Sequence, residues 1–213
     1  MMGRTHISGG LVAGLVAISM HVEKIPALAI VKTPTPIHFA ILIAGCLIGA
    51  LLIDSDTINS KAGRKLIFIS YPLLILNKLL NLFRLKYMAK LAGHRGILHS
   101  GVPLAIAIVA DSFYFGAIPM TLVTLTIQIL AFFSVGLLIG MASHLFLDAC
   151  TTEGIPLFAP FSLKRYSLFH IGTDSSAEVI VHVLLNVCAF VLFFKIMGVD
   201  LVSIIGTKLM ALV

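Results

Sequence analysis

Five apolar stretches along the chain have the length and composition of helices in or across a membrane. They cover residues 7–20, 36–53, 97–118, 121–147 and 177–199. At about 1.5 Å per residue, the longer ones cross most of a hydrocarbon core that is roughly 30 Å thick. The first stretch could continue in broken form to residue 31, whereas the apolar tail 201–213 is too short to span. The pattern predicts an all-α, polytopic membrane helical bundle of about four to five membrane helices, forming a single domain over residues 1–213.

A different pattern fills residues 60–90, where basic residues stand among apolar residues at helical spacing. The seven bases are Lys61, Arg64, Lys65, Lys78, Arg84, Lys86 and Lys90. This pattern is typical of an amphipathic basic helix on a membrane surface, and we expect Pro72 to interrupt it. The alternative is a helix that only packs on the domain. The other long loop, residues 149–176, carries prolines and glycines that predict ordered coil with short turns.

Composition supports a membrane protein. Hydrophobic residues make up 59% of the 213-residue chain and charged residues 11%, whereas about a quarter of a soluble domain is charged. The net charge of +6 would suit nucleic-acid binding, but most of the 15 bases fall in two loops between apolar stretches. We therefore expect membrane lipid, and no nucleic acid, as a partner. Three cysteines favour buried thiols over a disulfide framework. The first apolar stretch lacks a small-x-small cleavage site, so we interpret it as a retained helix.

The distribution of charge also predicts orientation. If the five helices alternate in direction, one face receives eleven of the fifteen bases: Arg4, the seven bases of residues 60–90, Arg95, Lys164 and Arg165. The positive-inside rule assigns this face to the cytoplasm and the C-terminus to the other side.

On this topology, unusual polar residues from five separate stretches reach one membrane depth. We expect His6 to precede the first helix, Asp54 and Asp56 to follow the second, and Glu178 to open the fifth. The other members open the third helix or close the fourth: His94, Arg95, His99, His144 and Asp148. Charged residues at the end of a bundle are costly unless they are partnered. Their convergence therefore predicts a shared site.

The residue types indicate a metal site. His144 and Asp148 are four residues apart, so both side chains leave one helical face and can hold one ion. Imidazole and carboxylate ligands together suit zinc first, with manganese or iron possible. Taken singly, each element has a plainer explanation: a lone Asp after an apolar helix is usually a cap, and a His/Asp pair is as often a structural hydrogen bond. We expect no ligand role for His21, His38 or His182, and His170 stays open.

Four motifs carry a family resemblance. They are LIDSD at residues 52–56, GHRGILHS at 93–100, SHLFLD at 143–148 and GIPLFAPF at 154–161. Together they resemble the YdjM-like family of membrane-bound metal-dependent hydrolases, and more remotely the zinc phospholipase C and related nucleases. The resemblance implies a bacterial inner-membrane protein with metal ligands at His6, Asp54, Asp56, His94, His99, His144, Asp148 and Glu178. Thr57 and Leu98 depart from the pattern, because the family often has His at the first position and Thr at the second.

These observations favour metal-assisted hydrolysis of a phosphoester or lipid-linked, amphiphilic substrate at the cytoplasmic face. Asp54 or Asp56 would take the proton from water, and Arg95, with Lys164 and Arg165, would neutralise an anionic substrate. A membrane transporter or metal-handling protein is the main alternative, and a structural protein with a vestigial site is another. A transport path would need polar residues through the bilayer depth, and the apolar stretches 36–53 and 121–147 offer few.

Overall fold

The protein is an all-helical membrane bundle, as the sequence predicts. The computed structural model describes residues 1–20, 25, 28–31, 33–56, 60–65, 67–93 and 95–199. Its long helices are α1 (Gly3–Ser19), α2 (Pro36–Leu52), α6 (Gly101–Gly116), α7 (Leu125–Ala149) and α8 (Ser176–Ile196). The shorter elements are α3 (Lys61–Lys65), α4 (Ile67–Leu82), α5 (Lys86–Leu91) and the 3₁₀ turns η3 (Ile53–Asp56), η4 (Ile97–His99) and η5 (Met120–Leu122).

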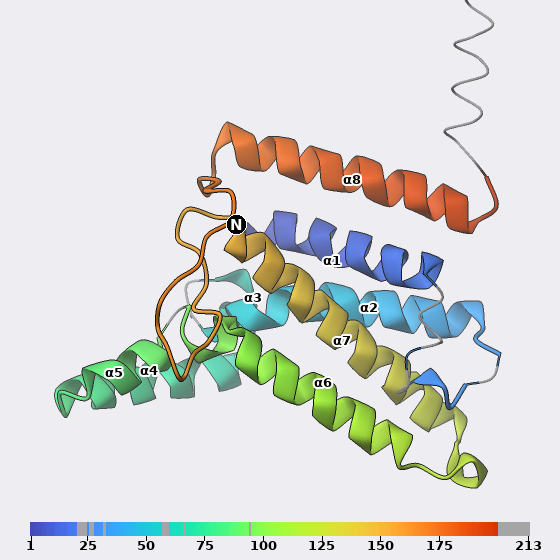
Figure 1. The fold of residues 1–213 in the computed structure, drawn as a ribbon, viewed down its shortest axis with the longest axis horizontal. Coiled ribbons are helices and arrows are strands. Elements are labelled where there is room, and N and C mark those ends of the chain that lie inside the picture. Colours follow the sequence, from blue (N-terminus) through green and yellow to red (C-terminus); the bar gives the residue numbers. More distant parts are fainter. Residues whose placement is uncertain are drawn as a thin grey trace, which may run out of the picture.

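The long helices lie side by side and bring five helix ends together (Figure 1). The beginnings of α1, α6 and α8 and the ends of α2 and α7 all lie at the left of that view. The loop after α7 and the short helices α3 to α5 lie at the same end. The gathering of polar helix ends that the topology predicts is therefore present in the fold.

Three helices in the described part of the chain are long and apolar enough to cross a membrane. They are α2 together with η3, α7 and α8. Helix α6 is apolar but has only 16 residues, and α1 has 17. Most apolar side chains of α8 are exposed on the protein surface, as expected of a helix that faces lipid. The tail 201–213 lies outside the described residues.

Glycines let α2 and α7 approach closely. A Cβ atom added at any of four glycines would overlap main-chain atoms of the facing helix: Gly45, Gly49, Gly136 and Gly140. In α1, a Cβ at Gly10 would likewise meet α2 at the Cys46 carbonyl. Small residues are favoured between membrane helices because dispersion contacts between close backbones replace the missing hydrophobic driving force. This packing sets the position of the α2 end relative to α7.

The boundaries differ from the prediction at three helix starts. Helix α7 begins at Leu125, after the separate turn η5, and not at residue 121. Helix α1 begins at Gly3, so His6 lies inside the helix rather than before it. Helix α6 begins at Gly101, and His99 lies in the separate turn η4. The reason at α1 is a tertiary contact, since Thr5 Oγ1 donates a hydrogen bond to Glu178 Oε1 at 2.9 Å and holds the first turn against α8.

The basic segment forms three helices, α3 to α5, rather than one helix interrupted at Pro72. Pro72 lies inside α4, where a proline removes one main-chain hydrogen bond. The turn comes instead at Arg84, which has a φ of 57°, and α5 packs back on α4 through a hydrogen bond from Asn77 Nδ2 to the Ala89 carbonyl. Many apolar side chains of α4 and α5 are exposed, among them Leu82 and Met88. That the pair lies on a membrane surface stays a prediction.

The loop between α7 and α8 is ordered, as expected for residues 149–176. Its turns are joined by two isolated bridges, Thr151 with Ile171 and Ile155 with Tyr166. The loop covers the end of the bundle at which the polar residues gather (Figure 1).

Candidate metal centre

Five imidazole and carboxylate side chains from four elements meet at the end of the bundle. Helix α1 supplies His6, η3 supplies Asp54, η4 supplies His99, and α7 supplies His144 and Asp148. Two overlapping groups have ligand atoms within 4.8 Å of one another: His6, Asp54 and His144, and then His99, His144 and Asp148. The three histidines and Asp148 are buried, whereas the Asp54 side chain is 18% exposed.

His144 presents one ring nitrogen to the cluster and uses the other to fix its orientation. Its Nδ1 donates a hydrogen bond to the main-chain carbonyl of Ala50, in the last turn of α2, at 2.6 Å. A neutral ring with its proton on Nδ1 has a lone pair on Nε2. That Nε2 atom is buried with no hydrogen-bond partner among the described residues.

The separations around His144 and His99 are those of ligands that share an ion. His144 Nε2 lies 3.6 Å from Asp54 Oδ1 and 3.5 Å from Asp148 Oδ2. His99 Nε2 lies 3.6 Å from each of the same two oxygen atoms. These distances exceed the roughly 2.7–3.2 Å of a hydrogen bond. Ligands bound tetrahedrally at about 2.0–2.2 Å stand roughly 3.3–3.6 Å apart, so the buried group of His99, His144 and Asp148 fits a divalent ion. Asp54 lies at the same distance from both histidines, at the edge of this group.

Asp56 lies on the far side of the His99 ring. Its Oδ2 is 3.0 Å from His99 Nδ1 and accepts a hydrogen bond from the main-chain N–H of Arg95 at 3.2 Å. Burial alone would lower the pKa of His99, but the carboxylates of Asp54 and Asp56 outweigh it and raise this pKa to about 9. A carboxylate behind a ligating imidazole commonly orients the ring and raises its basicity. The structure therefore places Asp56 to orient His99.

His6 completes the cluster from α1. Its ring stacks on that of His144 with centroids 3.7 Å apart, and its Nε2 lies 3.2 Å from Asp148 Oδ1. The amino group of Met1 contacts the same oxygen at 2.8 Å. His6 Nδ1 is buried without a hydrogen-bond partner in the described part of the chain.

Two of the eight predicted ligands, Asp56 and Glu178, lie outside these two groups, and a third is not among the described residues. Asp56 faces His99 as described, and His94 is outside the described residues. Glu178 is fully buried, but its oxygens accept hydrogen bonds from Met2 N at 2.5 Å, Thr5 Oγ1 at 2.9 Å and Asp174 N at 2.7 Å. This engagement makes Glu178 an anchor between the N-terminal turn and α8.

Arg95 is a basic side chain that contacts the cluster. Its Nη2 lies 3.6 Å from Asp148 Oδ2, and its Nη1 donates hydrogen bonds to Thr151 Oγ1 and the Gly154 carbonyl. The same Nη1 lies 3.4 Å from Glu153 Oε2. Two of the contacts at the site could not be predicted from the sequence: that of His144 with the Ala50 carbonyl and that of Arg95 with the Gly154 carbonyl. Any residue type supplies a main-chain carbonyl, so no sequence signal marks them.

The other two residues predicted to bind substrate, Lys164 and Arg165, lie on the loop between α7 and α8. Arg165 Nη1 lies 3.9 Å from Glu153 Oε2, which also contacts Arg95. Lys164 instead places its Nζ 5.6 Å from the centre of the Tyr166 ring. His170 is exposed, and His182 contacts Ser8 at 3.2 Å. Neither histidine belongs to the two ligand groups found among the described residues.

Comparison with known proteins now places this site in a family. The family model for the YdjM inner membrane protein matches residues 1–211, nearly the whole chain. The chain belongs to this family. A curated relative, the uncharacterized protein YvsG of Bacillus subtilis strain 168, is 31% identical over 181 residues, which cover 85% of this chain and 87% of the relative. No solved structure matches the chain.

Membership accounts for the membrane helices and supports an inner-membrane location. The description of the family names a location and no activity, and that of the relative names none either. What the cluster does must therefore be argued from its chemistry.

Proposed function

We propose that this YdjM-family protein is a membrane-bound metal-dependent hydrolase that acts on a phosphoester or lipid-linked substrate at the cytoplasmic membrane face. The observation that carries the proposal is the buried group of His99, His144 and Asp148 with the partly exposed Asp54 at its edge, joined by four nitrogen–oxygen separations of 3.5–3.6 Å. Burying so many ionisable groups at a bundle end is costly unless a cation partners them. Imidazole with carboxylate favours zinc, with manganese or iron as alternatives.

The residues of the cluster divide between holding an ion and handling a proton. His6, His99, His144 and Asp148 are buried and would hold the ion. A divalent ion in such a site lowers the pKa of bound water and acts as a Lewis acid. Asp54 is the most exposed member of the cluster, with 18% of its side chain accessible, so we assign to it the removal of a proton from water.

The basic residues beside the cluster favour an anionic substrate. Arg95 contacts the cluster through Asp148, and Arg165 reaches the same glutamate as Arg95. A guanidinium group can grip a phosphate with two hydrogen bonds. Arg95 would therefore stabilise negative charge on the reacting phosphoester. Lys164, which the sequence also suggests, would add to the local positive potential.

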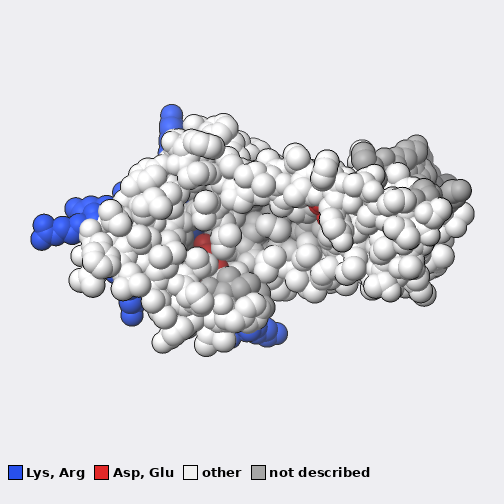
Figure 2. Space-filling view, turned by 90° about the horizontal axis from the view of Figure 1, so that it is seen from below, with Lys and Arg blue, Asp and Glu red and all other residues white. Residues whose placement is uncertain are grey.

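The cytoplasmic orientation is part of the proposal and rests on charge. Figure 2 shows Lys and Arg side chains projecting mainly at one end of the molecule, while the middle of that face shows small acidic patches among uncharged residues. The basic end is the one that carries α3 to α5 and the loop after α7. Basic residues are retained on the cytoplasmic side of inner-membrane proteins.

The test is metal analysis and hydrolysis by the purified full-length protein. We expect bound zinc or another divalent ion, and release of product from a phosphomonoester, a phosphodiester or a phospholipid. Asp54→Asn should keep most of the metal and lose at least about 100-fold in rate, within the range expected of a proton-transfer group. Lys65→Gln, an exposed base outside the site, is the control and should keep its rate. A metal-loaded protein that hydrolyses none of the three substrate classes would overturn the proposal.

A further inference from the structure

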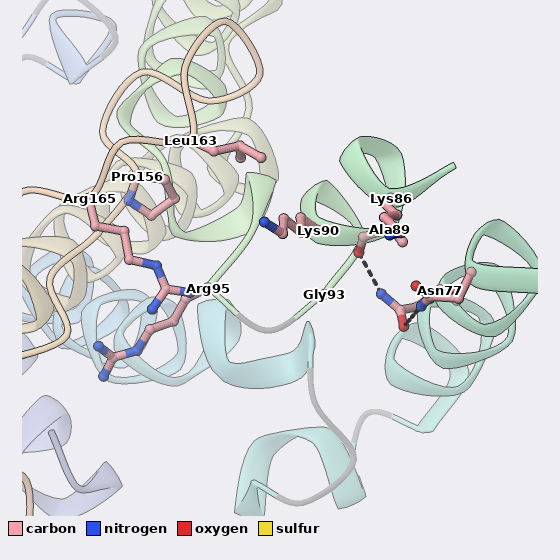
Figure 3. Close-up of a pocket in the computed structure, with 10 residues that line it drawn as sticks. Asn77, Lys86, Ala89, Lys90, Gly93, Arg95, Pro156, Leu163 and Arg165 are labelled. Atoms are coloured by element: carbon pink, nitrogen blue, oxygen red, sulfur yellow. Dashed lines mark hydrogen bonds between the residues drawn. The ribbon is translucent and has the colours of Figure 1, made fainter. Parts of the chain in front are cut away.

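A basic cavity lies beside the metal cluster, between the α4–α5 pair and the loop after α7. It has a volume of about 640 Å³, within the range of small-molecule sites. Four bases line it: Lys86 and Lys90 from α5, Arg95 before η4, and Arg165 from the loop. In Figure 3 the side chains of Arg95 and Arg165 lie close together on one side, and Lys90 extends from α5 on the other.

The lining is suited to an anion. No acidic residue lines this cavity in the described part of the chain. Arg95 is only 8% exposed, and its Nε atom is a buried donor without a partner among the described residues. Positive groups gathered around one cavity repel one another unless acids offset their charge, and the acids that contact Arg95 and Arg165 are not part of the lining. An anion in the cavity would reduce this repulsion and could accept a hydrogen bond from the Nε–H group of Arg95.

Glu153 is the acid nearest to two of these bases, and it lies at the exposed edge. Its carboxylate is 61% exposed and contacts Arg95 at 3.4 Å and Arg165 at 3.9 Å. An exposed ion pair of this kind contributes little free energy because water screens it. An incoming phosphate can therefore compete with Glu153 for both guanidinium groups.

The cavity is connected to the cluster and its walls are tied together. Arg95 joins it to the cluster, since Nη2 contacts Asp148 and the main-chain N–H is bonded to Asp56. The Tyr87 hydroxyl of α5 donates a hydrogen bond to the carbonyl of Pro160 in the opposite wall. An anion held here would lie one arginine away from the candidate metal ligands.

The surroundings of the cavity point to a lipid rather than a soluble anion. Large apolar side chains are exposed on the segments that supply the cavity lining, including Leu85 and Met88 next to the α5 bases in the chain and Phe161 and Phe169 on the loop. Phe161 is 83% exposed, which is unfavourable in water and favourable among acyl chains. Basic pockets bordered by membrane-facing apolar residues are typical of lipid headgroup sites.

We propose that this cavity binds the phosphate headgroup of an anionic membrane lipid and presents it to the metal cluster. The Lys86, Lys90 and Arg165 side chains would hold the phosphate, and the exposed apolar residues would stay with the acyl chains. The role of the lipid as substrate rests on the proposed function, whereas its binding in the cavity is tested separately.

The experiment measures lipid binding to the full chain in neutral detergent by native mass spectrometry. The probes are phosphatidylglycerol, phosphatidylcholine with the same acyl chains, and inorganic phosphate. Lys86→Gln with Lys90→Gln should weaken phosphatidylglycerol binding at least about tenfold, because each base near an anionic lipid contributes to attraction. Glu153→Gln should strengthen it, because the competing carboxylate is removed.

The matched control is Lys65→Gln with Lys78→Gln, which removes two exposed lysines that do not line the cavity. It should change binding less than about twofold. Equal weakening in the two double variants would overturn the proposal, as would equally tight binding of phosphatidylcholine. Inorganic phosphate that competes as well as the lipid would overturn the lipid assignment. Metal content, measured in the same samples, should stay unchanged. A protein without metal that still binds lipid through Lys86 and Lys90 would contradict the hydrolase and leave the headgroup site standing.

Discussion

Nδ1 of His144 donates a hydrogen bond to the carbonyl oxygen of Ala50, 2.6 Å away, and so joins the last turns of α7 and α2. The bond fixes the proton on Nδ1 and leaves Nε2 to face Asp54 and Asp148. One contact thus couples the packing of two membrane helices to the orientation of a candidate metal ligand.

The first prediction concerns the ligands in α7. His144→Ala and Asp148→Ala should each remove most of the bound metal, with a loss of affinity greater than the roughly 10–100-fold expected when only an orienting partner is removed. His182→Ala is the control, because His182 contacts Ser8 and Asn186 instead. The number of metal ions per protein molecule, measured by elemental mass spectrometry, checks the result. Full metal retention in the His144 and Asp148 variants would exclude the site, and loss in the His182 variant would add a ligand.

A second prediction tests the coupling between helix packing and the site. Gly49→Ala should destabilise the protein by about 1–3 kcal/mol, because the added Cβ overlaps main-chain atoms of Leu137 in a close-packed interface. The same substitution should lower metal affinity, since it pushes the Ala50 carbonyl away from His144. Gly116→Ala is the matched control, because a Cβ there has no neighbour within 4 Å. Thermal denaturation in detergent and metal titration of both variants provide the measurements. Equal stability of the two variants would contradict the packing argument.

The sequence predicts the location of the site better than its internal arrangement. Apolar stretches reveal how often the chain crosses the membrane, and alternation then assigns each helix end to one side. This is enough to bring His6, Asp54, His99, His144 and Asp148 to one depth, and the structure brings their side chains together. Depth is a one-dimensional property, however. It does not reveal which way a side chain points around its helix.

Two acids show the limit of that argument. Asp56 and Glu178 lie at the predicted depth, but Asp56 faces Nδ1 of His99 and Glu178 faces the N-terminal turn. The direction of Asp56 depends on the 3₁₀ turn after α2, and that of Glu178 on the packing of α1 against α8. Both are tertiary properties. The paired helices α4 and α5 were missed for a related reason, since the turn at Arg84 has a left-handed backbone without glycine.

A third prediction concerns pH. Protons and a divalent ion compete for the His99 ring, whose pKa the neighbouring carboxylates raise to about 9. Metal affinity should therefore increase with pH, by up to about tenfold per unit for one displaced proton, and level off above this pKa. Asp56→Asn removes one of the carboxylates that raise the pKa of His99. The pH at which the metal affinity stops increasing should therefore be lower in this variant. Titrations of Zn²⁺ against a chelator across neutral and alkaline pH would measure both profiles. An affinity that does not change with pH would show that the ion does not displace a proton from His99.

The last prediction concerns the side of the membrane that carries the site. Single cysteines at Lys78 and Lys164, both exposed, would be introduced into a chain whose three natural cysteines are replaced. A cysteine at Thr121 marks the opposite end of the bundle, where α6 is joined to α7 (Figure 1). A membrane-impermeant maleimide added to intact cells should label the cysteine at position 121 alone, because the positive-inside rule assigns the basic end to the cytoplasm. Permeabilisation should then expose positions 78 and 164 together. Labelling of those two positions from opposite sides would contradict the topology in which α4 and the loop after α7 lie on the same side of the membrane. If both are labelled from outside, the cluster remains intact but faces away from the cytoplasm, and the cytoplasmic phosphoester substrates of the proposed function would be ruled out.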